Sequence, residues 1–215
     1  MMKVIVMGGT RGIGNAIANS LQQYGHQVIS VGHHDVDTSD IGSVRQFIHN
    51  NPDTDILVLN TGGPPPKKYN DVTEQEWQKY HNQLFLSFVL ILQSIKVNKG
   101  GYIFLISSSV VKEPNPNLAI SSAYRAAFVE IFKLASRELA TQNISCINIA
   151  PGLISTDRTL EIMKDMEADI SSLPMGRMGR PSEIGDFVGA IVEKQIKYLS
   201  GVTVTFDGAS SAHIF

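Results

Sequence analysis

The sequence predicts an α/β fold in which a doubly wound parallel sheet lies between two layers of helices, formed as a single domain over residues 1–215. Short apolar runs rich in β-branched residues alternate with helical patterns along the chain, and such alternation is typical of βαβ units. The runs are apolar at almost every position, as strands are when helices cover both faces of their sheet. No repeat, low-complexity tract or linker-like change of composition divides the chain.

Apolar runs of four or more residues predict the strands. They span residues 4–7, 28–31, 56–59, 102–106, 145–149 and 202–206. Helical patterns lie between them, with acidic residues in the first turn of the third pattern and a proline just before the last. These patterns span residues 15–24, 44–48, 74–96, 122–140 and 182–192. Residues 62–68 and 155–180 are expected to be loops.

Charge and cysteine content exclude several classes of function. The chain carries 18 Lys and Arg against 20 Asp and Glu, so it lacks the basic surplus of a nucleic-acid-binding protein. The single cysteine, Cys146, excludes an intramolecular disulfide and a cysteine-based zinc cluster, and it fits a reducing cytoplasm. The longest apolar run, residues 84–95, is too short to span a membrane and is expected to be a buried helix. We therefore expect a cytoplasmic protein with neither a nucleic-acid nor a membrane partner.

A glycine-rich turn lies between the first expected strand and the first expected helix. Glycines allow a sharp turn and a close approach of the backbone to a phosphate, and the helix start that follows offers unpaired N–H groups. A plain strand-to-helix turn is the alternative, but the order strand, glycines, helix in a parallel α/β chain favours dinucleotide binding. The residues predicted to hold the pyrophosphate are Gly8, Gly9, Thr10, Arg11, Gly12, Ile13 and Gly14.

With this turn, the chain resembles the short-chain dehydrogenase/reductase family over nearly its whole length. Later motifs of that family follow in order. They are Asn60-Thr61-Gly62-Gly63, Ser107-Ser108, Pro151-Gly152 with Thr156, and Phe206-Asp207-Gly208. The resemblance implies a Rossmann-like fold, a pyridine nucleotide and hydride transfer to or from the carbon of a small-molecule carbonyl or alcohol. It also implies a homodimer or homotetramer, and it places these residues at the nucleotide: Asn60, Gly62, Pro151, Gly152 and Thr156.

The choice of nucleotide is argued from charge near the end of the second strand. An acid there would bond the ribose 2′-hydroxyl and repel a 2′-phosphate, but Gly32 holds that place and His33 and His34 follow. Arg11 lies in the glycine turn, where family members that prefer NADP often carry a base, so NADP(H) is favoured over NAD(H). A metal site at the two histidines is disfavoured because no third ligand is apparent.

The link from the second strand to Asp37 is shorter than the roughly dozen residues that a crossover connection needs, so this region is expected to be truncated. Asp37 itself has two interpretations. It bonds the adenine amino group of the nucleotide, or it caps the helix that contains residues 44–48.

The family's catalytic set is Ser, Tyr, Lys and Asn, and this chain matches it at one position. Ser108 follows the fourth strand, where the family's serine polarises the substrate carbonyl. The tyrosine and lysine positions fall on Ser121 and Arg125, which are neighbours on one helix face. Serine is a far poorer proton donor than a phenol, and arginine stays protonated but can place positive charge near an oxyanion. The asparagine position falls on Leu84, with Asn82 two residues early.

Tyr124 is the nearest phenol to the expected catalytic positions. On a helix it points about 60° away from Ser121, on the side opposite Arg125, so a packing role is favoured over catalysis. Glu113 lies close to Ser108 in sequence, and it is expected to be a solvated loop acid rather than a base.

The departures from the family pattern resemble a divergent branch in which Ser-x-x-x-Arg replaces Tyr-x-x-x-Lys. This branch also carries Gly-Gly-Pro-Pro-Pro and Pro-Gly…Thr-Asp-Arg segments, matched here by residues 62–66 and 151–158. Its members are labelled oxoacyl-carrier reductases by analogy of fold. The resemblance implies an NADP(H)-dependent oxidoreductase in which Ser108 orients the substrate oxygen, Arg125 the ribose and Thr156 the carboxamide.

Two points stay open at this level. The proton in such a reaction would come from Tyr124, from the substrate or from a water held by Ser121. The missing tyrosine and lysine also leave a second function open, in which the chain binds the nucleotide as a redox sensor or scaffold without efficient hydride transfer. A lyase or isomerase is disfavoured.

Overall fold

The computed structural model describes residues 1–166 and 170–214. In this part of the chain, six parallel strands form one sheet in the order β2-β1-β3-β4-β5-β6. The strands are β1 (Lys3–Met7), β2 (Gln27–Val31), β3 (Asp53–Leu59), β4 (Lys96–Ile106), β5 (Ser145–Pro151) and β6 (Val202–Phe206). Each contains one of the expected apolar runs, so the doubly wound parallel sheet is confirmed.

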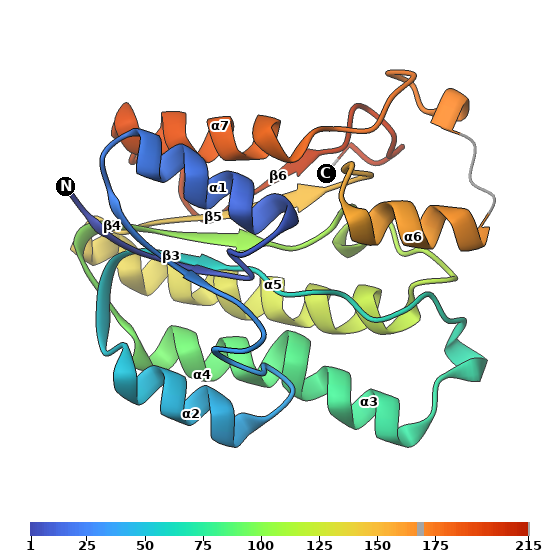
Figure 1. The fold of residues 1–215 in the computed structure, drawn as a ribbon, viewed down its shortest axis with the longest axis horizontal. Helices are drawn as coiled ribbons and strands as arrows, with labels where there is room; N and C mark the ends of the chain where they lie inside the picture. The colour runs from blue at the N-terminus through green and yellow to red at the C-terminus, as the bar shows by residue number, and fades with distance from the viewer. Residues whose placement is uncertain (167–169, 215) are drawn as a thin grey trace.

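Helices cover both faces of the sheet (Figure 1). On one face lie α1 (Gly12–Gln23) and α7 (Pro181–Glu193), and on the other lie α2 (Ile41–Asn50), α4 (Ser87–Ser94) and α5 (Ala119–Leu139). α1 and α7 pack closely against each other because α7 has glycines where it meets α1. A Cβ at Gly185 would lie 2.5 Å from the carbonyl oxygen of Ala16, which only a glycine avoids.

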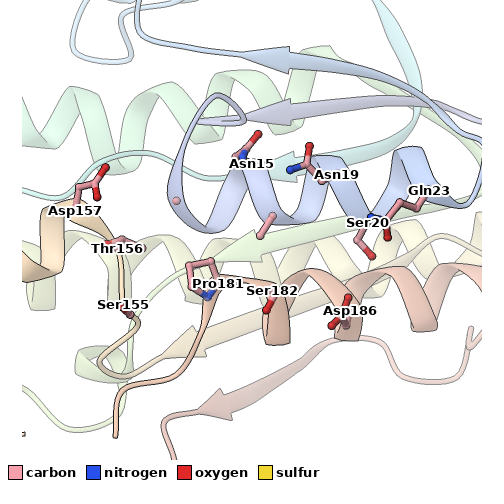
Figure 2. Close-up of a pocket in the computed structure, with 12 residues that line it drawn as sticks. Asn15, Asn19, Ser20, Gln23, Ser155, Thr156, Asp157, Pro181, Ser182 and Asp186 are labelled. Atoms are coloured by element: carbon pink, nitrogen blue, oxygen red, sulfur yellow. The ribbon is translucent and has the colours of Figure 1, made fainter.

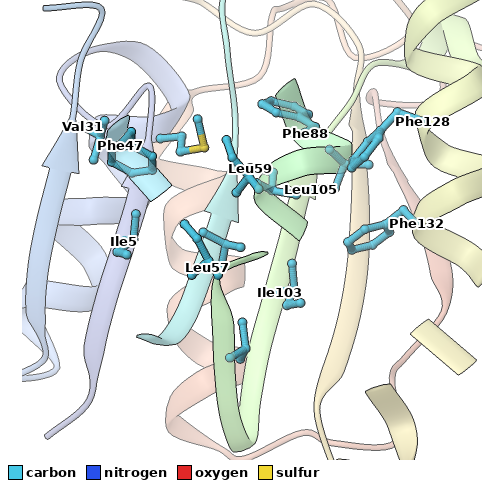
Figure 3. Packing of buried hydrophobic residues seen from close by; sticks show 14 of the residues in the cluster. Ile5, Val31, Phe47, Leu57, Leu59, Phe88, Ile103, Leu105, Phe128 and Phe132 are labelled. Atoms are coloured by element: carbon cyan, nitrogen blue, oxygen red, sulfur yellow. The ribbon is translucent and has the colours of Figure 1, made fainter. Parts of the chain in front are cut away.

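Two apolar clusters fill the space between the sheet and its helices. One lies under α2, α4 and α5, where the rings of Phe88 and Phe128 meet at 5.3 Å between centroids (Figure 3). The other lies under α1 and α7, around Ile17 and Val188. Because alternate strand residues point to opposite faces, both clusters draw on the same strands, as a sheet buried on both sides requires.

The prediction of one continuous helix over residues 74–96 is wrong, because the helix is interrupted in its middle and ends before residue 96. The structure has α3 (Glu74–His81), a π-helical segment (Asn82–Leu86) and then α4, and the chain is already extended at Ile95. Thr73 caps α3 with a reciprocal capping box to Glu76, which explains the start. The π segment inserts one extra residue into the helical turn, and a periodic pattern does not reveal such an insertion.

Other boundaries also differ from expectation. β4 begins at Lys96, because Lys96 and Val97 pair with the start of β3 before the two glycines at 100 and 101. α5 begins earlier than residue 122. The stretch 155–180 is not all loop, since it contains α6 (Asp157–Met166). Short 3-10 helices are η1 (Tyr69–Asp71), η3 (Ser109–Val111), η4 (Ala140–Gln142) and η5 (Ile170–Ser172).

In the described part of the chain, no helix has both the length and the apolar character needed to cross a membrane. The apolar stretch that the sequence assigned to a buried helix is α4 with the π segment before it, and it packs on α2 and α5.

Lys197 lies at the amino end of the sheet, far along the strands from the glycine turn. Its Nζ is 3.1 Å from the centroid of the Tyr102 ring and donates to the carbonyl oxygen of Gly101 at 3.2 Å. Burial lowers the pKa of Lys197 to about 8. In the native chain Lys197 therefore loses its proton near pH 8. In the unfolded chain the lysine has its ordinary pKa and keeps the proton until the pH is well above 9.

The free energy of unfolding should consequently rise between pH 8 and pH 10, by roughly 1 kcal/mol once screening by water is allowed for. Urea denaturation at several pH values measures this rise. Lys197→Met should remove it, whereas Lys194→Met, at an exposed neighbouring position, should keep it. An identical pH slope in wild type and Lys197→Met would contradict the assignment.

Candidate active site

The candidate site lies at the carboxyl ends of β1, β3, β4 and β5. The chain passes from β1 to β2 on one side and then crosses to β3 on the other, so the strand order reverses between β1 and β3. In open parallel sheets, ligands bind in the crevice at such a switch point. The glycine turn, Asn60, Ser108 and Pro151 all follow or end these strands.

The glycine turn is closed by contacts that admit no side chain. Gly8 and Gly12 have φ of 58° and 56°, the left-handed region that glycine adopts freely. A Cβ at Gly14 would lie 2.1 Å from the carbonyl oxygen of Gly8. The Asn60 side chain donates to the same oxygen at 3.3 Å, which ties the turn to the end of β3.

The N-terminus of α1 is left open for a ligand. Its N-cap residue, Arg11, is extended, and none of the described side chains caps this end. By contrast, Asp40 caps α2 and Thr73 caps α3. The free N–H groups and the positive end of the helix dipole suit a pyrophosphate. The residues of this turn therefore fit a dinucleotide.

The other predicted members of the turn take different positions. Arg11 and Thr10 are exposed, while Gly9 is buried against the end of β2. The side chain of Ile13 packs against the apolar cluster under α1, so only its backbone is available to a ligand.

The segment after β5 meets the glycine turn. A Cβ at Gly12 would lie 3.3 Å from Cγ2 of Thr156, so these two predicted cofactor residues are brought together. The Thr156 and Thr159 hydroxyls are hydrogen-bonded at 2.9 Å, which fixes the start of α6. A polar groove of about 460 Å³ begins here and runs between α1 and α7 past Asn19 and Asp186 (Figure 2).

Beyond the end of β2, His33 and Asp37 lie together, with Nδ1 3.9 Å from Oδ1. Burial raises the pKa of Asp37, but hydrogen bonds from Ser39 outweigh this and hold the pKa below its usual value. The capping interpretation of Asp37 is wrong, because Asp40 accepts the Gly42 N–H at 2.8 Å as the N-cap of α2.

Sequence reasoning missed a carboxylate at the end of β2. Asp35 turns back so that its Oδ2 accepts the Gly32 N–H at 2.7 Å, and this oxygen lies 3.5 Å from where a Cβ of Gly32 would be. The carboxylate of Asp35 therefore lies beside Gly32, the position at the end of β2 where the sequence has no acid. The only sequence signal was the turn-forming character of the segment.

Arg125 extends from α5 to the ends of β3 and β4. It donates to the carbonyl oxygens of Ile106 at 3.2 Å and Thr61 at 3.4 Å, and its Nε donates to Ser121 Oγ at 3.2 Å. Burial lowers the pKa of Arg125 to about 10, which leaves it protonated at neutral pH. The structure thus brings Ser121 and Arg125 together and places a fixed positive charge at the strand ends.

Ser108 is the second residue after β4 and caps the start of η3 in an extended conformation. Its Oγ accepts the N–H of Val110 at 3.4 Å, a long hydrogen bond that leaves the hydroxyl proton free to be donated. Arg125 also donates to the neighbouring carbonyl of Ser107 at 3.4 Å. Ser108 and Arg125 are therefore positioned by the same strand end.

Tyr124 points to α3 rather than to this group. Its hydroxyl donates to the carbonyl oxygen of Trp77 at 3.0 Å, and its ring contacts Trp77 and His81 edge-on at 5.6 and 5.7 Å between centroids. Burial raises the pKa of the Tyr124 phenol. In this conformation the phenol is not oriented to donate a proton beside Ser121.

Gln83, in the π segment, is a further candidate residue that counting along the helix missed. Its Nε2 donates to the carbonyl oxygen of Gly62 at 2.8 Å, next to the carbonyl that Arg125 binds. Leu84 is buried, and the Asn82 side chain donates to Ser39 at 3.3 Å instead. Because the π segment rotates the residues after it, the position predicted by regular helical counting is shifted.

Comparisons with known proteins identify the family and the fold. The family model described as enoyl-(acyl carrier protein) reductase matches residues 37–210. The 3-oxoacyl-[acyl-carrier-protein] reductase FabG of Rickettsia felis is 29% identical, with 95% of this chain and 94% of the relative covered. The 3-oxoacyl-[acyl-carrier-protein] reductase MabA of Mycobacterium tuberculosis is also 29% identical, with 95% of this chain and 91% of the relative covered.

Solved structures share the fold. A short-chain dehydrogenase family protein from Francisella tularensis superposes with a TM-score of 0.86 at 20% identity, covering 99% of this chain and 100% of its own. The angucycline C-6 ketoreductase LanV, solved with bound NADP, has a TM-score of 0.82 at 20% identity, with 96% and 94% covered. Because the family model matches most of the chain, the protein belongs to the short-chain dehydrogenase/reductase family of oxidoreductases.

Proposed function

We propose that the protein is an NADP(H)-dependent oxidoreductase that acts on a small carbonyl or alcohol substrate, in the manner of the oxoacyl-carrier reductases. One observation carries the proposal: an uncapped, glycine-closed helix start lies at the same sheet edge as a fixed guanidinium and a serine hydroxyl. The first suits a pyrophosphate, and the other two suit a developing oxyanion. The names of the acyl-carrier reductase relatives support the same substrate class.

Each part of the site has a role in this proposal. The glycine turn holds the pyrophosphate, Asn60 and Gly62 line the ribose side, and Thr156 bonds the carboxamide. The bound nucleotide supplies or accepts a hydride. Ser108 donates a hydrogen bond to the substrate oxygen, and Arg125 stabilises negative charge on it.

The proton is proposed to come from water held at the Ser121 hydroxyl. Arg125 cannot transfer a proton because the guanidinium stays charged, and Tyr124 donates to the Trp77 carbonyl instead. The Ser121 oxygen accepts from Arg125, so its own proton is free to bond a water or the substrate.

The preference for NADP(H) rests on Arg11, which is exposed in the glycine turn, and on His33, which is exposed just after β2. Asp35 opposes it, because its carboxylate repels a 2′-phosphate. Asp35→Asn keeps an oxygen for the Gly32 N–H and removes the charge, so the ratio of NADPH to NADH affinity should rise about tenfold. Fluorescence titration with each nucleotide measures this ratio, and Asp71→Asn, remote and exposed, is the control. An unchanged ratio would exclude Asp35 from the 2′-site.

A panel of ketones and 3-oxoacyl thioesters with NADPH tests the function. Ser108→Ala should lower kcat/KM about 100-fold on any substrate that turns over, because a hydrogen bond to the developing oxyanion is lost. Nucleotide affinity should stay the same. Ser122→Ala, whose hydroxyl donates to the Leu118 carbonyl, is the matched control. Turnover that is insensitive to Ser108→Ala would contradict the assigned role.

The position of Tyr124 favours a second candidate function. With this phenol directed at Trp77, the chain would bind the nucleotide without efficient turnover and act as a redox sensor or scaffold. Tight NADPH binding with no turnover across the panel supports this candidate. Calorimetry that detects no nucleotide binding excludes both candidates.

We further propose that residues 1–215 act as one nucleotide-binding domain and assemble as a homodimer or homotetramer. Family resemblance supports this, and Leu134 on α5 is 61% exposed, a large apolar side chain on an open helix face. Analytical ultracentrifugation measures the assembly.

A further inference from the structure

The turn that carries Ser108 is closed by Glu113, and Glu113 is held by the end of the chain. Ser108 Oγ accepts the N–H of Val110, and the N–H of Glu113 donates to the carbonyl oxygen of Ser109 at 3.1 Å. The Glu113 side chain then accepts the backbone N–H of Ala212 on Oε2 at 3.0 Å. Glu113 is therefore solvent-exposed, as the sequence predicted, but its carboxylate is also hydrogen-bonded to the C-terminal segment.

His213 makes the second contact between these segments. Its side chain is 15% exposed, with Nδ1 3.8 Å from Oε2 of Glu113 and Nε2 3.4 Å from the hydroxyl of Thr205 on β6. Nδ1 is buried and has no hydrogen-bond partner in the described part of the chain. A buried polar nitrogen is costly without an acceptor nearby, and the Glu113 carboxylate is the acceptor it faces.

Asp207 anchors the base of the C-terminal segment. Its Oδ1 accepts the Ala209 N–H at 3.0 Å, and its Oδ2 accepts both the N–H and the hydroxyl of Ser211. Burial raises the pKa of Asp207, but these hydrogen bonds and the nearby His213 hold it below its usual value. A Cβ on Gly152 would lie 2.7 Å from Cβ of Asp207, so the anchor packs against a predicted nucleotide residue.

We infer that residues 207–214 form a clasp that positions Ser108. The clasp is anchored at Asp207, crosses the end of β6 and holds the turn of residues 108–113 through Glu113 and His213. Glu113 and His213 are positioning residues, because they act on the substrate only through Ser108. The inference rests on the proposed function of Ser108, while the clasp itself is a structural claim that is tested separately.

Two measurements on the full-length chain test the clasp. Glu113→Leu should speed hydrogen exchange at the amides of residues 110–113 about fivefold, the effect of losing one exposed hydrogen bond, and should leave the glycine turn unchanged. kcat should fall by a similar factor of about five, while KM and Kd for the nucleotide stay the same. Glu113→Gln, which keeps an oxygen for the Ala212 N–H, should restore most of both. Glu130→Leu, at an exposed position of α5, is the control, and His213→Ala should reproduce part of the effect.

The outcomes are distinct. Faster exchange confined to residues 110–113, with a fall in kcat that Glu113→Gln rescues, supports the clasp and its role. Unchanged exchange in Glu113→Leu, or faster exchange over the whole chain, overturns the clasp. Faster local exchange with unchanged kcat overturns the positioning role. If no substrate turns over in wild type, the proposed function and the positioning role both fail, and exchange still decides whether the clasp exists.

Discussion

Gly14→Ala should weaken nucleotide binding at least about 100-fold, equivalent to about 2.7 kcal/mol. The added Cβ would lie 2.1 Å from the Gly8 carbonyl oxygen and 2.9 Å from the Asn60 amide nitrogen, so the turn must open. Opening the turn moves the free N–H groups of α1 away from the proposed position of the pyrophosphate. Calorimetric titration with NADPH measures the loss.

Stability should fall in the same variant, by about 1–3 kcal/mol, because an extra methyl is forced into a packed site. Gln22→Ala, on an exposed position of α1, is the control and should bind as wild type does. Binding by Gly14→Ala within threefold of wild type would show that the nucleotide does not use this turn.

Arg125→Met should lower kcat/KM about 100- to 1,000-fold, since it removes a fixed charge from the proposed position of the developing oxyanion. Stability should change much less. Burial of the guanidinium lowers its pKa to about 10, so the native fold already opposes the charge. The groups it binds are carbonyls and a serine hydroxyl rather than a carboxylate, and no described carboxylate is left unpaired when it is removed.

The carbonyl oxygens and the Ser121 hydroxyl lose a donor, but the cost of burying the charge is lost too, so we expect Arg125→Met to lower the free energy of unfolding by no more than about 1–3 kcal/mol. Arg137→Met, at an exposed position of the same helix, controls for the loss of a charge from α5. A large loss of stability together with the loss of activity would make Arg125 a structural residue and remove the main support for its role at the oxyanion.

The catalytic pattern shows where sequence reasoning succeeds. Ser121 and Arg125 are four residues apart on one helix, so their contact follows from helix geometry alone, and the structure joins them at 3.2 Å. Ser108 lies at the end of β4, as its place after an apolar run predicts. Tyr124 required the tertiary structure, because the direction of a side chain on a helix does not reveal that the Trp77 carbonyl will bind its hydroxyl.

Gln83, Asp35 and Glu113 show the limit of the same reasoning. A π segment shifts Gln83 out of the regular helical count, a turn of three residues returns Asp35 to the end of β2, and Glu113 bonds to Ala212, 99 residues away. Each of these contacts depends on a local irregularity of the backbone or on a partner far away in the sequence. The spacing of apolar residues predicts neither of these.

The sequence by itself determined the parallel α/β architecture and the place of the glycine turn, because buried strands, helix periodicity and glycine conformation are local properties. The tertiary structure alone decided which polar side chains meet at the sheet edge. Those pairs join strand ends, a π segment and the C-terminus, and their geometry exists only once the sheet has brought these segments together.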